Sequence, residues 1–220
     1  MSIDGIIFDF DGVLIESEYV GNEQIAWTLT ELGYPTTVDQ SLDCFTGLGG
    51  RDFFEAVERH IGGPIPEAFT EARAIEDARA LADGVDAVVG AVAFVRSLPK
   101  DLPRAIASSS TTHWIRTHLD HLGLRASFEP HIYSGREHVT RGKPAPDVYL
   151  HAAAMLDVDI ARTLIIEDSV VGVTGAVASG AQVVGLAVGR HCRDGHGEKL
   201  RAVGATRIVH DFDAIATLFD

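Results

Sequence analysis

The chain has 220 residues, of which 46% are hydrophobic and 23% are charged, and its formal net charge at pH 7 is −14. This length and composition suit one large globular domain, or one domain with a smaller insertion, and exclude an intrinsically disordered chain. The negative charge argues against nucleic acid as a partner, because phosphate backbones are bound by Lys and Arg. An anionic substrate would therefore need a local cation, such as a metal ion.

The first predicted strand is the apolar run Ile6, Ile7 and Phe8, which has no polar break. Such a run is typical of a strand buried on both faces of a parallel sheet. Residues 17 to 83 then carry helical patterns and no convincing strand. A helical segment inserted after one strand predicts a separate small lobe. We therefore expect a helical cap domain at residues 16–83 and an α/β core domain at residues 1–15 and 84–220.

From about residue 85, short apolar strands alternate with amphipathic helices. The later predicted strands are residues 104–107, 131–133, 163–166, 182–188 and 207–209. The predicted helices are residues 88–98, 115–122, 147–156, 169–179 and a tail beyond residue 211. Repeated strand–helix units predict an α/β fold with a doubly wound parallel sheet, that is, a Rossmann-like core.

The two cysteines, Cys44 and Cys192, are too few for a disulfide framework, so a reducing compartment is the simplest setting. The chain shows no apolar signal segment, and no apolar run approaches the roughly 20 residues that span a bilayer. We expect a soluble cytoplasmic protein without membrane contact. Cys192 lies near His191 and His196, but the spacing is not that of a zinc motif, and a polar loop is the favoured interpretation.

Two carboxylates, Asp9 and Asp11, stand where the first predicted strand ends. In open α/β sheets, ligands bind outside the carboxyl ends of the strands, which is where this pair falls. An Asp-x-Asp pair can hold a divalent cation, and one carboxylate can attack while the other moves a proton. The alternative is an ordinary polar turn, since Asp and the following Gly12 are common turn residues.

Polar groups also follow two later strands, namely Ser108 and the pair Glu167 and Asp168, and Lys143 precedes a helix start marked by prolines. Each has a structural alternative. Ser108 could cap the next helix, Glu167 and Asp168 could form the acidic first turn of a helix, and Lys143 could be a solvated surface charge. Because the carboxyl ends of parallel strands meet at one edge, we expect all these groups to converge there with the first acidic pair. Together they are the parts that phosphoryl transfer requires.

This order of motifs resembles the haloacid-dehalogenase-like superfamily over nearly the whole chain. Three stretches carry the resemblance: Asp9-Phe10-Asp11-Gly12-Val13-Leu14, Gly142-Lys143-Pro144-Ala145-Pro146 and Ile166-Glu167-Asp168-Ser169. The helical insertion resembles the small cap of the branch that contains phosphosugar phosphatases and β-phosphoglucomutase. The second Asp of the first stretch favours phosphoryl transfer over dehalogenation, because dehalogenases lack that acid.

The resemblance implies a Mg²⁺-dependent phosphatase that hydrolyses a small phosphorylated metabolite, such as a sugar phosphate or a related acid, through an aspartyl-phosphate. Asp9 would attack phosphorus, and Asp11 would protonate the leaving oxygen and then deprotonate water. Ser108 and Lys143 would hold the phosphoryl oxygens. The implied metal ligands are Asp9, the backbone carbonyl of Asp11, and Asp168, with Glu167 in or near the shell. The implied substrate-binding residues are Gly12, which lets the loop turn Asp11 toward the site, Ser109 and Arg51.

The segment Thr46-Gly47-Leu48-Gly49-Gly50-Arg51 resembles the family's cap specificity loop, where Arg51 would bind a second phosphate or a carboxylate. An exposed Arg at a helix start is the alternative. A phosphomutase is a rival function, but many relatives carry a His near position 21, where this chain has Gly21. A non-catalytic interaction protein of the same fold is the second rival, and the filled catalytic positions argue against it.

Overall fold

The computed structural model describes residues 3–48 and 50–219. Their backbone contacts divide the chain into an α/β unit, made of the residues up to Glu16 and from Asp86 onward, and a helical unit, Ser17–Val85. Glu16 belongs to the α/β unit because its N–H donates to the Asp86 carbonyl at 2.9 Å. Ile15 likewise forms an antiparallel bridge with Ala87.

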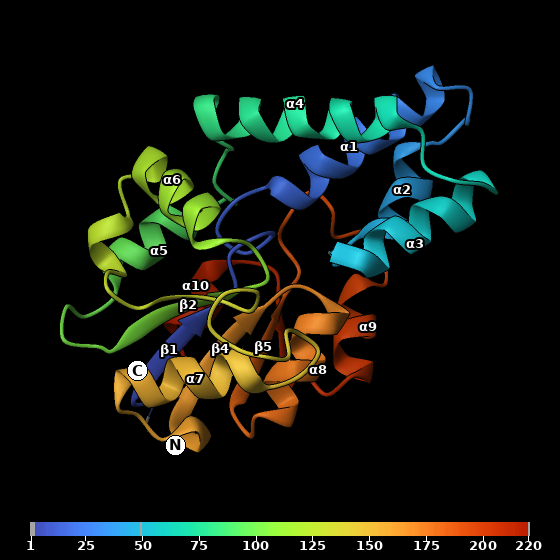
Figure 1. Ribbon diagram of the computed structural model, residues 1–220. Helices are drawn as coiled ribbons and strands as arrows, with labels where there is room; N and C mark the ends of the chain where they lie inside the picture. The colour runs from blue at the N-terminus through green and yellow to red at the C-terminus, as the bar shows by residue number, and fades with distance from the viewer. Residues whose placement is uncertain (1–2, 49, 220) are drawn as a thin grey trace. The chain divides into compact units, whose positions relative to one another are not determined.

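The described part of the α/β unit contains one sheet of six parallel strands in the order β3-β2-β1-β4-β5-β6 (Figure 1). The strands are β1 Gly5–Phe8, β2 Arg104–Ser108, β3 Ile132–Ser134, β4 Thr163–Glu167, β5 Gln182–Leu186 and β6 Arg207–Val209. This order confirms the predicted doubly wound parallel sheet. The chain leaves β1 toward β2 on one side and returns to β4 on the other, so the carboxyl end of β1 lies at a topological switch point.

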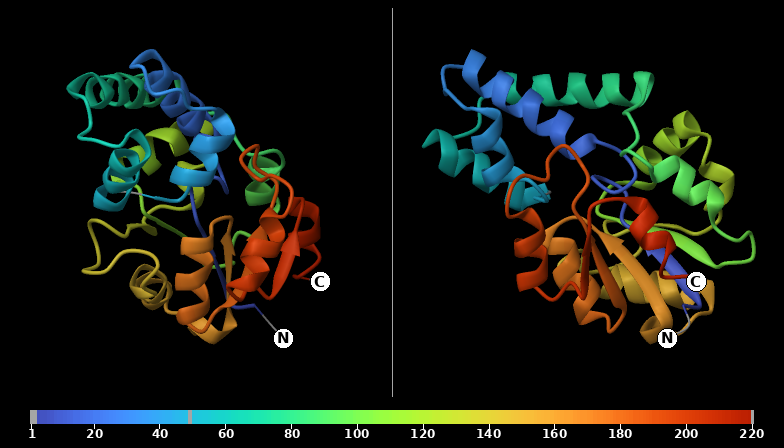
Figure 2. Two further views of the ribbon diagram at one scale, coloured as in Figure 1. Left: turned by 90° about the vertical axis from the view of Figure 1, so that its right-hand side faces the viewer. Right: turned by 180° about the vertical axis from the view of Figure 1, so that it is seen from behind.

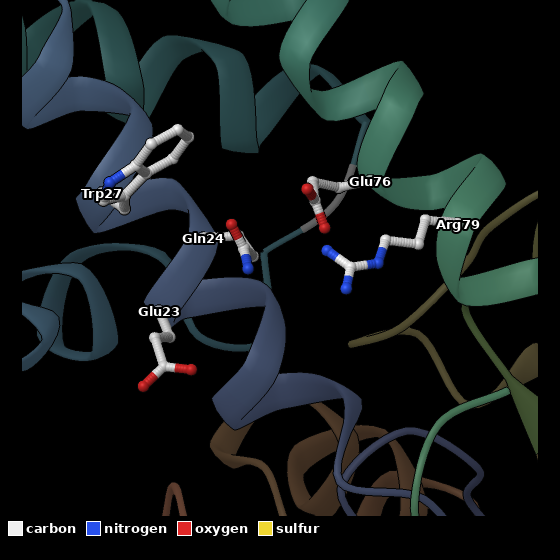
Figure 3. Close-up of a pocket in the computed structure, with 5 residues that line it drawn as sticks. All are labelled: Glu23, Gln24, Trp27, Glu76 and Arg79. Atoms are coloured by element: carbon white, nitrogen blue, oxygen red, sulfur yellow. The ribbon is translucent and has the colours of Figure 1, made fainter. Parts of the chain in front are cut away.

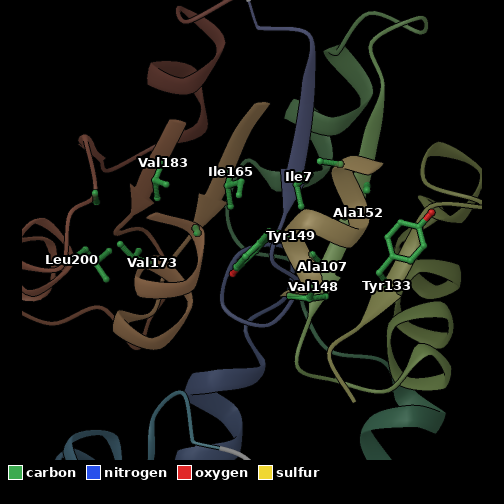
Figure 4. Close-up of a cluster of buried hydrophobic side chains, with 14 residues drawn as sticks. Ile7, Ala107, Tyr133, Val148, Tyr149, Ala152, Ile165, Val173, Val183 and Leu200 are labelled. Atoms are coloured by element: carbon green, nitrogen blue, oxygen red, sulfur yellow. The ribbon is translucent and has the colours of Figure 1, made fainter. Parts of the chain in front are cut away.

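Helices flank the sheet on both sides (Figure 2). They are α5 Ala91–Ser97, α6 Thr112–Leu122, α7 Asp147–Leu156, α8 Val170–Ala178, α9 His196–Ala202 and α10 Phe212–Ala216. On one face, Ile7 and Ile165 of the central strands pack in a buried cluster with Val148 of α7, Val173 of α8 and Leu200 of α9 (Figure 4). This cluster holds the helix starts close to the strand ends.

The opposite face of the sheet is packed by aromatic rings. The ring centroid of Phe8 lies 6.1 Å from that of Phe94 in α5 and 5.5 Å from that of Phe128. Phe94 in turn lies 5.3 Å from Phe212 of α10. Successive residues of a strand point to opposite faces, so Ile7 and Phe8 serve different layers. Both layers bury β1, which explains its unbroken apolar sequence.

The helical unit contains α1 Ser17–Glu31, α2 Val38–Phe45, α3 Gly50–Ile61 and α4 Glu67–Asp83. Its buried core includes Ile25, Leu29, Phe45, Val57 and Phe69. Ile25 and Leu29 lie four residues apart in α1, and the other three come from α2, α3 and α4, so each helix directs apolar side chains into one core. Over the described residues, every helix is too short or too polar to span a membrane.

One predicted loop is partly helical. The sequence predicts a polar loop at His191, Cys192 and His196, and His191 and Cys192 do precede α9 in non-helical backbone. His196, however, is the first residue of α9 and follows Gly195, whose φ is +79°. A seven-residue helix with mostly polar residues gives too little periodicity to be predicted from the sequence.

Candidate active site

Three of the predicted site residues lie at the carboxyl ends of three neighbouring strands. Asp9 directly follows β1, Ser108 ends β2 and Glu167 ends β4. The strands are in register there, with Phe8 opposite Ile106 and opposite Ile166. The Asp9 N–H extends this pairing by donating to the Ile166 carbonyl at 3.0 Å.

The structural alternatives for three of these groups do not hold. The cap of α6 is Thr111, whose hydroxyl accepts from the Trp114 N–H at 3.2 Å, so Ser108 is not the cap. Lys143 has a side chain only 3% exposed and is no surface charge. Glu167 belongs to β4, and the helix after it is capped by Ser169. These polar groups therefore need another explanation.

Lys143 lies among buried carboxylates, which we call the acidic cluster: Asp9, Glu167 and Asp168. The Lys143 Nζ lies 2.8 Å from Asp9 Oδ1 and 2.5 Å from Glu167 Oε1. Carboxylate oxygens of the three acids lie within 4.8 Å of one another, and all three residues are buried. One ammonium group thus faces three carboxylates away from water.

This crowding shifts proton affinities. Burial raises the pKa of Asp9 well above its ordinary value, and the charge of Glu167 raises it further, although Lys143 opposes both effects. Burial and Glu167 raise the pKa of Asp168 in the same way. For Lys143, burial lowers the pKa, but the neighbouring charges of Asp9 and Glu167 outweigh it and leave the pKa raised. The cluster therefore holds its lysine charged and favours any additional positive charge.

Glu167 is fixed by donors on both of its oxygens. Oε1 accepts from Lys143 Nζ and from the Tyr149 hydroxyl, each at 2.5 Å. Oε2 accepts from the next two backbone N–H groups, at 3.2 and 3.3 Å, and from the Ser169 hydroxyl at 3.2 Å. Gly172 makes room for this carboxylate, because a Cβ there would lie 2.0 Å from its atoms. Glu167 is thus a fully bonded anchor for Lys143.

Asp168 has a different environment. Its Oδ2 lies 2.8 Å from Nε2 of the buried His191. Its Oδ1 is buried and accepts no hydrogen bond from the described residues. Gly12 has a φ of +77°, and a Cβ there would lie 1.9 Å from Asp168 Oδ2, so both backbone geometry and space require glycine. A buried carboxylate oxygen without a donor is costly unless a cation is present.

These features fit a divalent metal ion. The acidic cluster offers carboxylate oxygens, which are the donors preferred by hard cations, at mutually close positions. The donorless Asp168 Oδ1 supplies a ligand atom that already lies out of water. A bound cation would also offset the repulsion that raises the pKa values of Asp9 and Asp168.

Asp11 belongs to a second group of contacts, which we call the Asp11 network. Its Oδ2 accepts from the hydroxyls of Ser110 at 2.6 Å and Ser108 at 3.3 Å. Its Oδ1 accepts from the Trp114 indole N–H at 3.0 Å. Asp11 is half-buried, and its charge is close enough to Asp168 to raise the pKa of that carboxyl. The carboxylate is held by neutral donors and keeps access to solvent.

The predicted substrate-binding side chains Ser109 and Arg51 are both exposed. Ser109 is exposed after the end of β2. Arg51 lies in α3 with a side chain 89% exposed, and its guanidinium is paired with Glu55 at 2.6 Å. Arg51 is thus exposed in the first turn of α3. Gly49 of the predicted specificity loop lies outside the described residues.

Four residues of the site were not predicted to act there: Ser110, Trp114, Tyr149 and His191. Ser110 completes a run of three serines that begins with the last residue of β2, so its proximity in the chain to a predicted site residue is visible in the sequence. Tyr149 and Trp114 reach the site from helices, so only the packing of those helices on the sheet reveals their roles. His191 was noticed only as part of a polar loop, because its contact with Asp168 spans 23 residues of sequence.

A separate cavity of about 390 Å³ lies in the helical unit, between α1 and α4 (Figure 3). Its lining is Glu23, Gln24, Trp27, Glu76 and Arg79. Within the described residues, this lining contains none of the side chains predicted to act in catalysis. The cavity therefore does not replace the sheet edge as the candidate active site.

The chain is similar to several known proteins, and three of them illustrate the similarity. The 6-phosphogluconate phosphatase of Escherichia coli K12 is 24% identical over 94% of this chain and 91% of its own length. Hexitol phosphatase A of the same strain is 28% identical over 84% of each chain. The crystal structure of a HAD family hydrolase from Deinococcus radiodurans R1, solved with bound phosphate and sodium, matches with a TM-score of 0.83 and 30% identity, over 98% of this chain and 95% of that one.

The names of the two curated relatives agree with the predicted activity of a phosphoric monoester hydrolase. The family model described as haloacid dehalogenase-like hydrolase matches residues 3–180. The matched region includes β1, β2 and β4 together with the acidic cluster and the Asp11 network. The chain belongs to the haloacid dehalogenase-like hydrolases.

Proposed function

We propose that this protein is a Mg²⁺-dependent phosphatase that hydrolyses a small sugar phosphate, or a related phosphorylated acid, through an aspartyl-phosphate on Asp9. The contact of Lys143 with Asp9, at 2.8 Å in a buried cluster of carboxylates, carries this proposal. A carboxylate that must attack an anionic phosphate needs nearby positive charge, and the chain supplies it at that atom.

Asp9 is the proposed nucleophile. Its Oδ1 contacts Lys143, which leaves Oδ2 as the attacking atom. In the first step, Oδ2 forms a bond to phosphorus as the bond from phosphorus to the ester oxygen breaks. Lys143 holds Asp9 in place and offsets the repulsion between nucleophile and substrate. The hydroxyl of Ser108 would then turn from Asp11 to a phosphoryl oxygen.

Asp11 is the proposed general acid and base. In its protonated form it gives the proton to the leaving ester oxygen, so the alcohol departs neutral. The resulting carboxylate then takes a proton from water, and the oxygen of that water attacks phosphorus and releases Asp9. This restores the protonated Asp11 and yields inorganic phosphate. The half-buried position of Asp11 supports the assignment, because a group that exchanges protons in each cycle needs access to solvent.

Asp9 and Asp168 would hold the Mg²⁺ ion, with the backbone carbonyl of Asp11 as the third protein ligand expected from the family. When bound, the ion polarises phosphoryl oxygens and neutralises developing charge. The sequence places Glu167 in or near the metal shell. Its oxygens accept five hydrogen bonds, so we propose that its main role beside that shell is to anchor Lys143.

The substrate class is supported by the relatives, whose names specify 6-phosphogluconate and hexitol phosphates. Arg51 remains a proposed contact for a carboxylate or second phosphate. Its exposed guanidinium could exchange Glu55 for a substrate anion at little cost, because exposed ion pairs contribute little free energy.

The test is the release of inorganic phosphate from a panel of substrates: 6-phosphogluconate, hexitol phosphates, hexose 1-phosphates and phosphoglycolate. Each is assayed with Mg²⁺ and with a chelator, using the wild type and Asp9→Asn. The matched control is Asp101→Asn, which makes the same chemical change in an exposed turn. We expect metal-dependent release that Asp101→Asn retains and that Asp9→Asn loses by about 10⁴-fold or more.

Three outcomes would contradict the proposal. Isomerisation of a hexose 1-phosphate without release of phosphate would indicate the phosphomutase alternative. Failure to release phosphate from every substrate, by a folded wild-type protein with Mg²⁺, would favour the non-catalytic alternative. Full activity of Asp9→Asn would exclude Asp9 as the nucleophile.

A further inference from the structure

A second group of metal-ligating side chains lies beside the acidic cluster. His191, Cys192 and His196 each offer a ligand atom, and these atoms lie within 4.8 Å of one another. The side chain of His191 is fully buried, whereas Cys192 and His196 are half-buried. The group therefore has a fixed inner member and two members that solvent can reach.

The backbone between β5 and α9 brings these residues together. The Cys192 N–H donates to the Gly189 carbonyl at 2.8 Å, and the His196 N–H donates to the Arg193 carbonyl at 2.9 Å. Two successive turns therefore fold the segment back on itself, so residues five apart can share one ion.

The His191 ring occupies a space that glycines leave. A Cβ on Gly189 would lie 2.6 Å from this ring, and one on Gly12 would lie 3.0 Å from it. The ring is thus inserted between two backbone segments. Its Nε2 lies 2.8 Å from Asp168 Oδ2 and 3.3 Å from the Cys192 sulfur. His196 approaches the same acid, because its Nε2 lies 2.6 Å from the Asp168 carbonyl oxygen.

The chemistry of these donors differs from that of the acidic cluster. Two imidazoles and a thiolate suit Zn²⁺, whereas carboxylates alone suit Mg²⁺. Zinc bond lengths of about 2.0–2.3 Å place tetrahedral ligands about 3.5 Å apart. The present separations of His191 Nε2 from Cys192 Sγ and from Asp168 Oδ2, 3.3 and 2.8 Å, need only small side-chain movements to reach that geometry.

We propose that His191, Cys192 and His196 form a zinc-binding site, with Asp168 Oδ2 as the fourth ligand. Binding replaces the proton of the Cys192 thiol, which passes to solvent. Each histidine binds as a neutral imidazole through a ring nitrogen that carries no proton, and its other ring nitrogen keeps the proton. The contact of His191 with Asp168 is replaced by a shared bond of each residue to the metal ion. None of the four ligand residues is oxidised or reduced.

The position of Asp168 couples this site to the active site. Under the proposed function, Asp168 is a ligand for Mg²⁺. A second divalent ion on the same carboxylate takes up part of its negative charge and repels Mg²⁺, so it weakens Mg²⁺ binding. Zinc bound here is therefore an inhibitor of the phosphatase. This coupling rests on the proposed function, whereas zinc binding itself does not.

Cobalt spectroscopy tests the site without any enzymatic assay. Co²⁺ is titrated into the reduced, metal-free wild type, Cys192→Ser and Cys44→Ser, the last being the matched control because Cys44 is exposed in α2 of the helical unit. We expect a thiolate-to-cobalt charge-transfer band in the wild type and in Cys44→Ser, removed by added Zn²⁺, and no such band in Cys192→Ser. A wild type without the band, or a band that Cys192→Ser retains, would overturn the proposal.

Inhibition tests the coupling. With saturating Mg²⁺, the Zn²⁺ concentration for half-inhibition should rise roughly 10- to 100-fold in Cys192→Ser and stay unchanged in Cys44→Ser. Equal inhibition of all three proteins would show that zinc acts at the acidic cluster itself, which overturns the coupling. If no substrate is hydrolysed, the proposed function fails, while the cobalt band still decides whether the zinc site exists.

Discussion

The acidic cluster and the Asp11 network lie at the same sheet edge, but their negative charges are stabilised in different ways. In the cluster, three buried carboxylates share one ammonium group, and the pKa values of Asp9 and Asp168 are raised. In the network, one half-buried carboxylate accepts hydrogen bonds from two hydroxyls and an indole N–H. The first holds charge out of water, whereas the second holds a carboxylate at the edge of water.

Because of this difference, we expect substitutions in the acidic cluster to change stability and substitutions in the Asp11 network to change activity. Buried, incompletely compensated charge is costly to folding, so changes of charge in the cluster alter the free energy of unfolding. The neutral donors of the network can bond an amide as well as a carboxylate, so changes there leave the fold intact and affect only proton transfer. Each of the following substitutions tests one side of this contrast.

The largest effect is expected in the network. Asp11→Asn keeps an acceptor oxygen for Trp114 or Ser110 but removes the transferable proton. We expect kcat to fall by about 10²- to 10⁴-fold, with the midpoint of urea unfolding unchanged within error. A large loss of stability, or a kcat within threefold of wild type, would contradict the separation of roles.

In the cluster, Lys143→Met removes the cation that contacts Asp9 and Glu167. Leaving those charges buried without their partner should lower the free energy of unfolding by about 3–5 kcal/mol in metal-free buffer at neutral pH. Lys100→Met, in an exposed turn, is the control and should change it little. Asp9→Asn in the Lys143→Met background should recover part of the loss, and simple additivity in urea unfolding would argue against their coupling.

The two regions also differ in how far the sequence predicts them. Asp9, Ser108 and Glu167 were located correctly at strand ends, because a buried parallel strand is an unbroken apolar run whose end is visible. Of the donors to Asp11, the sequence predicts only Ser108 as a site residue, and it predicts that hydroxyl for phosphoryl oxygens. Trp114 comes from a helix, and its approach depends on how α6 packs, which periodicity does not specify. The same holds for Tyr149 and for the buried state of Lys143, whose neighbours in sequence give no sign of burial.

A smaller effect is expected at Gly172, which makes room for Glu167 without carrying charge. A Cβ there would lie 2.0 Å from the Glu167 carboxylate, which has no space to retreat because donors hold both oxygens. Gly172→Ala should therefore destabilise the protein by about 1–3 kcal/mol. Gly21→Ala is the matched control in α1, where nothing lies within 4 Å, and should stabilise by about 0.5–1 kcal/mol. Equal effects of the two substitutions on urea unfolding would show that Glu167 is not held rigidly.

The smallest expected effect is a gain in the free energy of unfolding caused by Asp9→Asn, and it depends on pH. The pKa of Asp9 is raised in the folded protein by burial and by Glu167, so above the ordinary value of 3.8 the unfolded chain ionises more readily than the folded one. Ionisation of Asp9 therefore costs stability as pH rises from about 4 toward its folded pKa, and at lower pH this cost is absent. Asp9→Asn removes that cost.

Without divalent ions, Asp9→Asn should be more stable than wild type by about 1 kcal/mol at pH 7, and the difference should vanish near pH 3. Thermal unfolding of both proteins across this range measures it, with Asp101→Asn as the exposed control. Saturating Mg²⁺ should stabilise the wild type more than Asp9→Asn and so reduce or reverse the gap, because only the wild type offers the Asp9 carboxylate to the ion. If the Asn variant were less stable than wild type at every pH, the contact of Asp9 with Lys143 would stabilise the fold by more than burial of the Asp9 charge costs. The cluster would then be stable without a metal ion.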